Sequence, residues 1–177
     1  MRNSKIIALI CLWGIFFTSC DKEPKSEWKA FYNFTNEDII GTYSYSNVSD
    51  AFDDIEGIGR HACDDAQVRI QALYDHSDWI KFIVNCPSED FSRNFEGEAT
   101  PNEGDYMIRM STDYIHSGGK VKAYNLNASV MTNEKQEIRL HGFAAENTYK
   151  EITDLETGVT TYETIDGEYY YFDVIKN

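Results

Sequence analysis

The chain has 177 residues, of which 42% are hydrophobic, and its 30 acidic and 16 basic side chains give a formal net charge of −14. The length suits one domain with processing segments, and the hydrophobic content excludes wholesale disorder. The charge argues against nucleic-acid binding, which needs a basic face. The 12 Tyr and 10 Phe, with only 3 Pro, favour a sheet protein.

Residues 1–19 are typical of a secretory signal peptide. Arg2 and Lys5 form a short positive region, and the apolar run over residues 6–18 is too short to span a bilayer comfortably. A retained membrane anchor is the alternative interpretation of this run.

The end of the run, Phe17-Thr18-Ser19-Cys20, resembles the lipobox of bacterial lipoproteins, although an aliphatic residue is usual where Phe17 stands. In that family the signal is cut before the Cys, so the resemblance implies that Cys20 carries acyl chains. Several acyl chains anchor a protein stably without a spanning helix. Residues 20–35 are then the lipidated Cys and its tether. The charged residues after Cys20 resemble signals that send some Gram-negative lipoproteins to the cell surface. The resemblance thus implies an outer-membrane location, with a surface-facing or periplasmic orientation left open.

Two cysteines remain once Cys11 leaves with the signal and Cys20 carries lipid. Cys63 and Cys86 would then lie in an oxidising compartment, where such a pair bonds. Two unpaired thiols are one alternative. A metal site with His61 is another, but this set is incomplete because a tetrahedral site needs four ligands. We expect a disulfide and no metal.

Residues 36–177 form the predicted β domain. A short helix is expected near Thr35, and the β-forming residues 40–45 follow it as a first strand. Residues 49–59 are acidic and rich in glycine, which indicates a loop, with one helical turn expected near Ala51. Alternating apolar and polar residues predict the later strands within 67–74, 80–86, 106–111, 120–131, 137–141 and 169–174, with turns at 75–78, 117–119 and 154–158. The last of these turns separates two further strands, which are polar.

About eight or nine strands without a long helix must pair largely antiparallel. An up-and-down barrel is the expected architecture because closure removes exposed edges, and a β-sandwich is the alternative. The stretch NEDIIGTYSY (36–45) resembles the start of lipocalin-like domains, in which a short helix leads into Gly-x-Trp on the first strand. Here Gly41-Thr42-Tyr43 takes that place, with Tyr for Trp. The resemblance implies a barrel whose closed end is plugged by Tyr43.

Candidate chemistry is sparse. His76, Ser77 and Asp78 have the residue types of a catalytic triad, but consecutive residues cannot adopt its geometry. The acidic residues from Asp50 to Glu56 could offer oxygen ligands to calcium, yet they do not fit the EF-hand pattern, so an irregular calcium site and a solvated loop both stay open. The histidines show no metal-ligand spacing. We therefore expect no catalytic residue and no cofactor.

The run Tyr169-Tyr170-Tyr171-Phe172 suggests stacking on sugar rings. Neighbours on a strand point to opposite faces, so only Tyr169 and Tyr171 share a surface. Core lining and cross-strand pairing are the alternative roles of these rings. The sequence favours a lipid-anchored, non-enzymatic binding protein for a small or glycan ligand. The alternative is a structural or interaction lipoprotein that contacts an envelope assembly or a host molecule.

Overall fold

The computed structural model describes residues 27–46, 57–73, 76–98, 107–117 and 120–177. These residues form one β-sheet with two short helical segments, which confirms the predicted all-β, mainly antiparallel class. The strands are β1 (Lys29–Ala30), β2 (Gly41–Tyr45), β3 (Arg60–Ala62), β4 (Gln67–Leu73), β5 (His76–Cys86), β6 (Phe91–Glu98), β7 (Ile108–Ser111), β8 (Ile115–Ser117), β9 (Lys120–Thr132), β10 (Ile138–Thr153) and β11 (Thr160–Lys176). The helical segments are α1 (Asn36–Ile39) and the 3-10 turn η1 (Pro87–Glu89).

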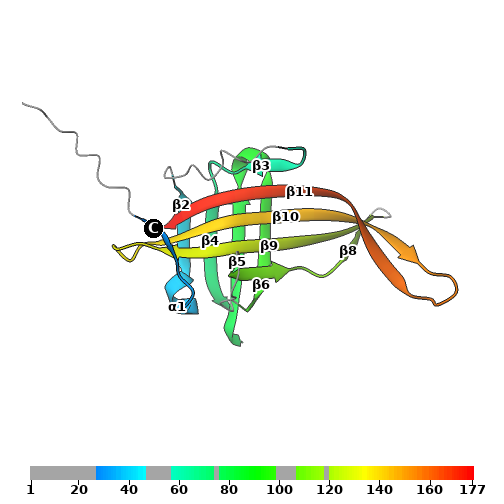
Figure 1. The fold of residues 1–177 in the computed structure, drawn as a ribbon, viewed down its shortest axis with the longest axis horizontal. Helices are drawn as coiled ribbons and strands as arrows, with labels where there is room; N and C mark the ends of the chain where they lie inside the picture. Colours follow the sequence, from blue (N-terminus) through cyan, green and yellow to red (C-terminus); the bar gives the residue numbers. More distant parts are fainter. Residues whose placement is uncertain (1–26, 47–56, 74–75, 99–106, 118–119) are drawn as a thin grey trace, which may run out of the picture.

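The sheet folds over into two layers. Its strand order is β1-β9-β10-β11-β2-β4-β5-β6, with β7 and β8 on β9 and β3 parallel to β11. Figure 1 shows β9, β10 and β11 running across β2, β4, β5 and β6, so these two groups of strands form the layers. They are joined where β11 pairs with β2 through Val174–Lys176.

The sheet is not closed into a barrel, which corrects the expected closed architecture in favour of its sandwich-like alternative. At the open side, β6 approaches β7 closely enough that a Cβ at Gly97 would lie 3.6 Å from Met110 Cγ. Within the described part of the chain, however, no ladder of hydrogen bonds joins these two strands. The pairing also departs from an up-and-down order, because the last strand lies between β10 and β2.

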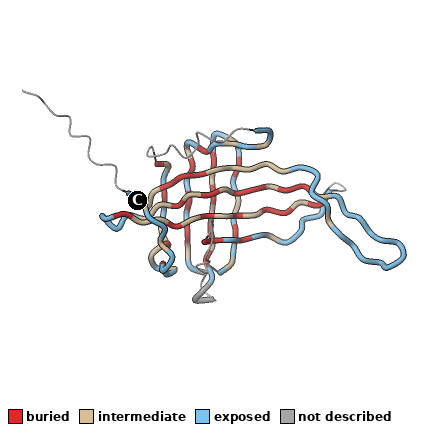
Figure 2. The backbone as a smooth tube through the Cα atoms, in the orientation of Figure 1, coloured by how far each residue is buried: buried red, intermediate tan, exposed pale blue. Residues whose placement is uncertain are grey.

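The core fills the space between the layers. Figure 2 shows buried positions alternating along the strands, as expected for a sheet with one face on a core. Phe82 of one layer packs against Phe172 of the other, with ring centroids 6.2 Å apart. The largest fully buried side chains besides these two are Tyr43, Phe95, Ile39, Ile70, Ile80, Ile108, Leu126, Leu140, Val68 and Val84.

The predicted helix and first strand are present. Thr35 caps α1 through a capping box with Asp38, which satisfies amide groups at the start of the helix. Tyr43 on β2 is only 1% exposed, and its hydroxyl donates a hydrogen bond of 2.5 Å to the Ile39 carbonyl. Burial raises the pKa of this hydroxyl well above its usual range, with Asp38 adding to the effect. Tyr43 therefore fixes α1 against the core.

The packed part of the chain begins before residue 36. Residues Lys29–Ala30 pair with β9, and Phe34 is 4% exposed within the core. The segment expected to be the end of a tether thus contributes to the domain. A second helical turn expected near Ala51 lies outside the described residues.

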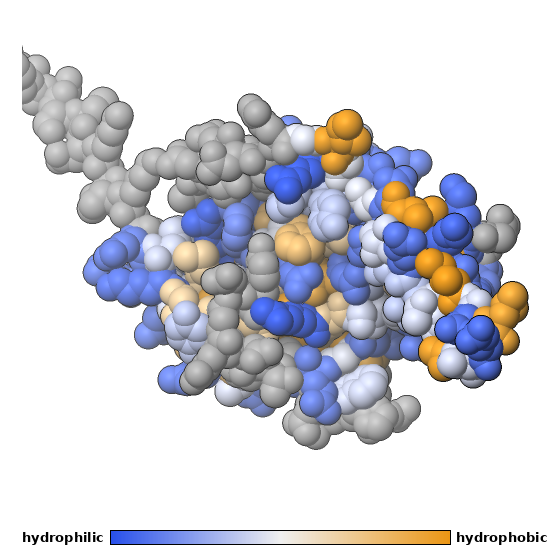
Figure 3. Space-filling view, turned by 45° about the vertical axis from the view of Figure 1, so that its right-hand side comes forward, coloured by the Kyte–Doolittle hydropathy of each residue, from blue (hydrophilic) through white to orange (hydrophobic). Residues whose placement is uncertain are grey.

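The two polar strands expected on either side of residues 154–158 are the outer parts of β10 and β11, which are continuous with the strands expected at 137–141 and 169–174. Each continues past the core to the expected turn at 154–158, with a register shift between Thr148 and Tyr149. This hairpin projects from the body of the molecule, and its end is exposed (Figures 1 and 2). Figure 3 shows apolar residues on this projection, where Leu155 is 97% and Val159 is 56% exposed.

Candidate functional site

The layer formed by β9, β10 and β11 has two unlike faces. Its inner face carries Leu126, Leu140 and Phe172, which are all fully buried in the core. Its outer face carries the intervening residues, and these are aromatic rings, amides and small side chains. Strand alternation places each set on its own face, so the outer set depends on no core contact for its orientation.

The pairing register arranges the outer residues in rows across the strands. Ala145 on β10 lies between Asn125 of β9 and Tyr169 of β11. In the row on one side, Phe143 lies between Asn127 and Tyr171. In the row on the other side, Asn147 lies between Ala123 and Gly167. Among the small residues of these rows, Ala145 lines a hollow between larger neighbours.

This outer hollow has a volume of about 450 Å³. Its lining residues are Arg109, Met110, Ser111, Asn125, Leu126, Asn127, Phe143, Ala145, Asn147 and Tyr169. Ligand sites in proteins commonly measure about 300–1,000 Å³ and combine apolar surface with a few convergent polar groups. The hollow fits this description in both size and chemistry.

The aromatic wall of the outer hollow is held together by contacts between rings. The ring of Phe143 meets Tyr169 edge to face at 5.7 Å and lies 5.5 Å from the ring of Tyr171. The surface shared by Tyr169 and Tyr171, as predicted from alternation, is therefore present, and Phe143 is the ring that unites them. Phe143 was missed because the sequence gives no sign that it pairs opposite Tyr171.

Asn147 is the most unusual polar residue of the outer hollow. Its side chain is 7% exposed, and the described residues give its amide no hydrogen-bond partner. A Cβ at residue 167 would lie 3.0 Å from Asn147 Oδ1 and 3.1 Å from the Tyr169 ring, so Gly167 leaves the room that both side chains occupy. An amide that lines a hollow without a protein partner binds water, which a ligand group can replace.

Two further amides line the hollow from β9. Asn125 and Asn127 occupy alternate positions, and the described residues supply no hydrogen-bond partner for either side chain. Each amide offers both donors and an acceptor. The pair Asn125-Leu126-Asn127 was the available sequence signal, because uncharged amides alternate there with a core residue.

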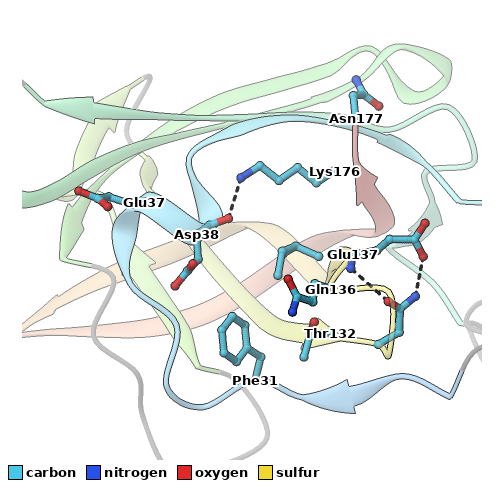
Figure 4. Close-up of a pocket in the computed structure, with 10 residues that line it drawn as sticks. Phe31, Glu37, Asp38, Thr132, Gln136, Glu137, Lys176 and Asn177 are labelled. Atoms are coloured by element: carbon cyan, nitrogen blue, oxygen red, sulfur yellow. Dashed lines mark hydrogen bonds between the residues drawn. The ribbon is translucent and has the colours of Figure 1, made fainter.

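A larger hollow, of about 660 Å³, lies between α1 and the β9–β10 turn (Figure 4). Its polar groups already bind one another. Lys176 Nζ donates to the Asp38 carbonyl at 2.7 Å, and Asn133 Nδ2 donates to Glu137 at 2.5 Å. Asn133 Oδ1 also accepts the backbone amides of Lys135 and Glu137. This hollow therefore offers fewer free groups to a ligand than the outer one.

The cysteines singled out by the sequence lie together. The Sγ atoms of Cys63 and Cys86 are 2.13 Å apart and their Cα atoms 5.5 Å apart, at disulfide distance. Beside them, Asp65 accepts hydrogen bonds of 2.9 Å from both the amide and the hydroxyl of Ser88. This cluster ties the start of β4 to the end of β5.

His61 lies between two carboxylates rather than in a metal site. Its Nε2 is 2.6 Å from Glu168 and its Nδ1 is 2.8 Å from Glu89, while the ring stacks on Tyr170 at 5.0 Å. The hydrogen bond with Glu168 raises the pKa of His61 above its ordinary value, against an opposing effect of burial, and Glu89 adds to the rise. These contacts of His61 hold β3 against β11 and η1.

The structure describes only some of the other predicted positions. Cys20 and the acidic cluster from Asp50 to Glu56 lie outside the described residues. His76, Ser77 and Asp78 fall within β5, although the sequence predicts a turn there. His116 lies 3.8 Å from Glu151, and His141 lies 3.7 Å from Asp173.

Across the described ranges, no three His, Cys, Asp or Glu side chains gather so as to hold a metal ion. Nor does any helix there have the length and apolar character needed to cross a membrane. No protein-family model matches this chain, and neither the curated proteins nor the solved structures yield a match.

Proposed function

We propose that this protein is a lipid-anchored binding protein of the bacterial outer membrane whose outer hollow binds a glycan. The anchor rests on the resemblance of Phe17-Thr18-Ser19-Cys20 to a lipobox, with Cys20 as the lipidated residue. The observation that supports the binding function is a hollow of about 450 Å³ in which the amides of Asn125, Asn127 and Asn147 lie beside the Phe143–Tyr169 wall.

A sugar ring matches the two kinds of surface in the hollow. Its C–H face is apolar, so an aromatic ring such as Tyr169 removes it from water, and its edge carries hydroxyl groups. Asn125, Asn127 and Asn147 supply donors and acceptors for adjacent hydroxyls. A purely apolar ligand would leave these amides without partners, which favours a polar ligand over a fatty one.

The test is a saccharide-binding screen with the full chain in detergent, followed by titration of the variants Tyr169→Ala and Asn147→Ala. Each variant should weaken binding about tenfold, which corresponds to about 1.4 kcal/mol. The matched controls are Tyr32→Ala, an exposed tyrosine outside the hollow, and Asn94→Ala, an exposed strand asparagine. Unchanged binding in both hollow variants would contradict the site.

The projecting hairpin favours a second function, contact with a protein of the envelope or the host. Exposed Leu155 and Val159 lie at its end among Glu151, Asp154 and Glu156, so a partner with basic side chains around an apolar patch would complement it. Crosslinking on intact cells separates the two functions. Loss of a specific crosslinked product in Leu155→Ser, with unchanged glycan binding, would support this second function.

A further inference from the structure

The outer hollow has a charge unlike that of the whole chain. The protein has 30 acidic residues, yet Arg109 is the one charged side chain among those that line the hollow. Arg109 lies on β7 opposite Asn127, and it is exposed. Among the described residues no carboxylate pairs with its guanidinium group. The guanidinium group of Arg109 therefore lies at the edge of a hollow whose described lining residues include no acid.

One carboxylate along the same outer face is already neutralised. Asp173 receives hydrogen bonds from Arg139, one of them of 2.6 Å to Nε. It lies two residues along β11 from Tyr171, in the row of His141 rather than in that of Arg109. Among the described residues, Asp173 is therefore not the counter-charge of Arg109.

We propose that the ligand is a saccharide residue that carries one carboxylate, a sugar of the uronic-acid type, and that Arg109 pairs with this carboxylate. This inference rests on the proposed glycan-binding function. The guanidinium group presents paired N–H donors in a planar fork that matches a carboxylate, while Asn125 and Asn127 are placed for the neighbouring hydroxyls.

The net charge of −14 limits how many carboxylates the ligand can bear. The overall field repels a polyanion, but charges more than about 8 Å apart are largely screened at physiological salt. A single carboxylate in contact with Arg109 gains its attraction at short range. A polymer with an acid on every residue would place the others against the acidic remainder of the surface.

The test uses the full chain in detergent at 0.15 M salt, an ionic strength of about physiological value. The probes are the methyl glycosides of glucuronic, galacturonic and mannuronic acid, each titrated beside its neutral glucose, galactose or mannose counterpart. At least one acid should bind about tenfold more tightly than its neutral partner, as expected for a charge-assisted pair. Arg109→Gln should abolish this preference, whereas Lys135→Gln, which removes a positive charge outside the outer hollow, should retain it.

Three results would overturn the inference: equal binding of acid and neutral forms, a preference that survives Arg109→Gln, or no binding of any uronide. If one of these results occurs while neutral-sugar binding is still lost in Tyr169→Ala, the uronide preference is overturned and the proposed function stays intact. Failure of every saccharide in the wider screen to bind the wild-type chain would overturn both.

Discussion

The two faces of the β9–β10–β11 layer differ although the same strands build both. The inner face is apolar and fully covered by the other layer, with Leu126 and Phe172 at 0% exposure. The outer face mixes rings, amides and small residues with the Asp173–Arg139 pair, and its Asn147 lines the outer hollow without a hydrogen bond to the described residues. Core packing explains the inner residues but not those that line the hollow. The difference indicates that the inner face stabilises the fold, whereas the proposed ligand site lies on the outer face.

The largest expected effect is a difference in stability between variants of two chain neighbours, Phe172 and Tyr171, which lie on opposite faces. Phe172→Ala should lower the free energy of unfolding by about 3–5 kcal/mol because it leaves a cavity between the layers. Tyr171→Ala, on the outer face, should cost about 1 kcal/mol or less. Urea unfolding of both variants measures the contrast. Equal losses of unfolding free energy in the two variants would mean that stability does not depend mainly on the inner face.

Asp173 lies on the outer face but is buried, so it tests whether the outer face contributes to stability at any position. It is fully buried, and its charge pairs with Arg139, whose guanidinium also lies over the ring of Trp28 at 5.6 Å. Asp173→Ala should destabilise the protein by about 3–5 kcal/mol, since it leaves Arg139 partly buried without its counter-charge. The matched control is Asp166→Ala, an exposed acid on the same strand.

The Asp173–Arg139 pair makes the free energy of unfolding depend on pH. Burial alone would raise the pKa of Asp173, but the hydrogen bonds and charge of Arg139, with His141 nearby, hold it below its ordinary value. A lowered pKa means that the pair stabilises the fold above the unfolded pKa of about 3.9 and that this contribution is lost as the pH falls further. Unfolding curves below about pH 5 should therefore converge for wild type and Asp173→Ala.

Both cysteines of the disulfide are buried in the core and neither lines the outer hollow, so removing the bond should lower stability while leaving the hollow in place. Cys63→Ala with Cys86→Ala should cost about 2–4 kcal/mol, mainly by freeing the unfolded chain. Glycan binding of the folded variant should equal that of wild type. Thiol titration of the unfolded, unreduced mature protein should find no free thiol from this pair. Two reactive thiols there would refute the bond.

The smallest expected effect is the pH response of His61. Because Glu168 and Glu89 raise the pKa of His61, its protonated form stabilises the attachment of β3 fully below the unfolded pKa of about 6.5, and this contribution is lost as the pH rises through the folded pKa. Stability measured from about pH 5 to pH 8.5 should decline less in His61→Gln than in wild type. An NMR titration that gives a His61 pKa at or below about 6.5 would contradict the stabilisation of the protonated ring by Glu168 and Glu89.

Local alternation was enough to predict much of the fold. The period of two in residues 67–74 and 120–131 predicted β4 and β9, and the same rule placed Tyr169 and Tyr171 on one surface. The capping signal at Thr35 predicted α1. These features depend only on neighbouring residues, which is why the sequence alone determines them. The continuity of β10 and β11 escaped prediction because no local pattern links their polar outer ends to the parts that cover the core.

Only the tertiary structure decided the sheet order and the outer hollow. The join of the layers pairs Tyr43 with Lys176, which are far apart in the chain, and no local pattern specifies that contact. The hollow forms because the registers of three strands bring Ala145 and Gly167 beside Asn147 and Phe143. A shift of one residue in either pairing would turn a strand over and replace these side chains with core residues. Strand character is thus local in this protein, whereas the shape of its outer hollow depends on long-range register.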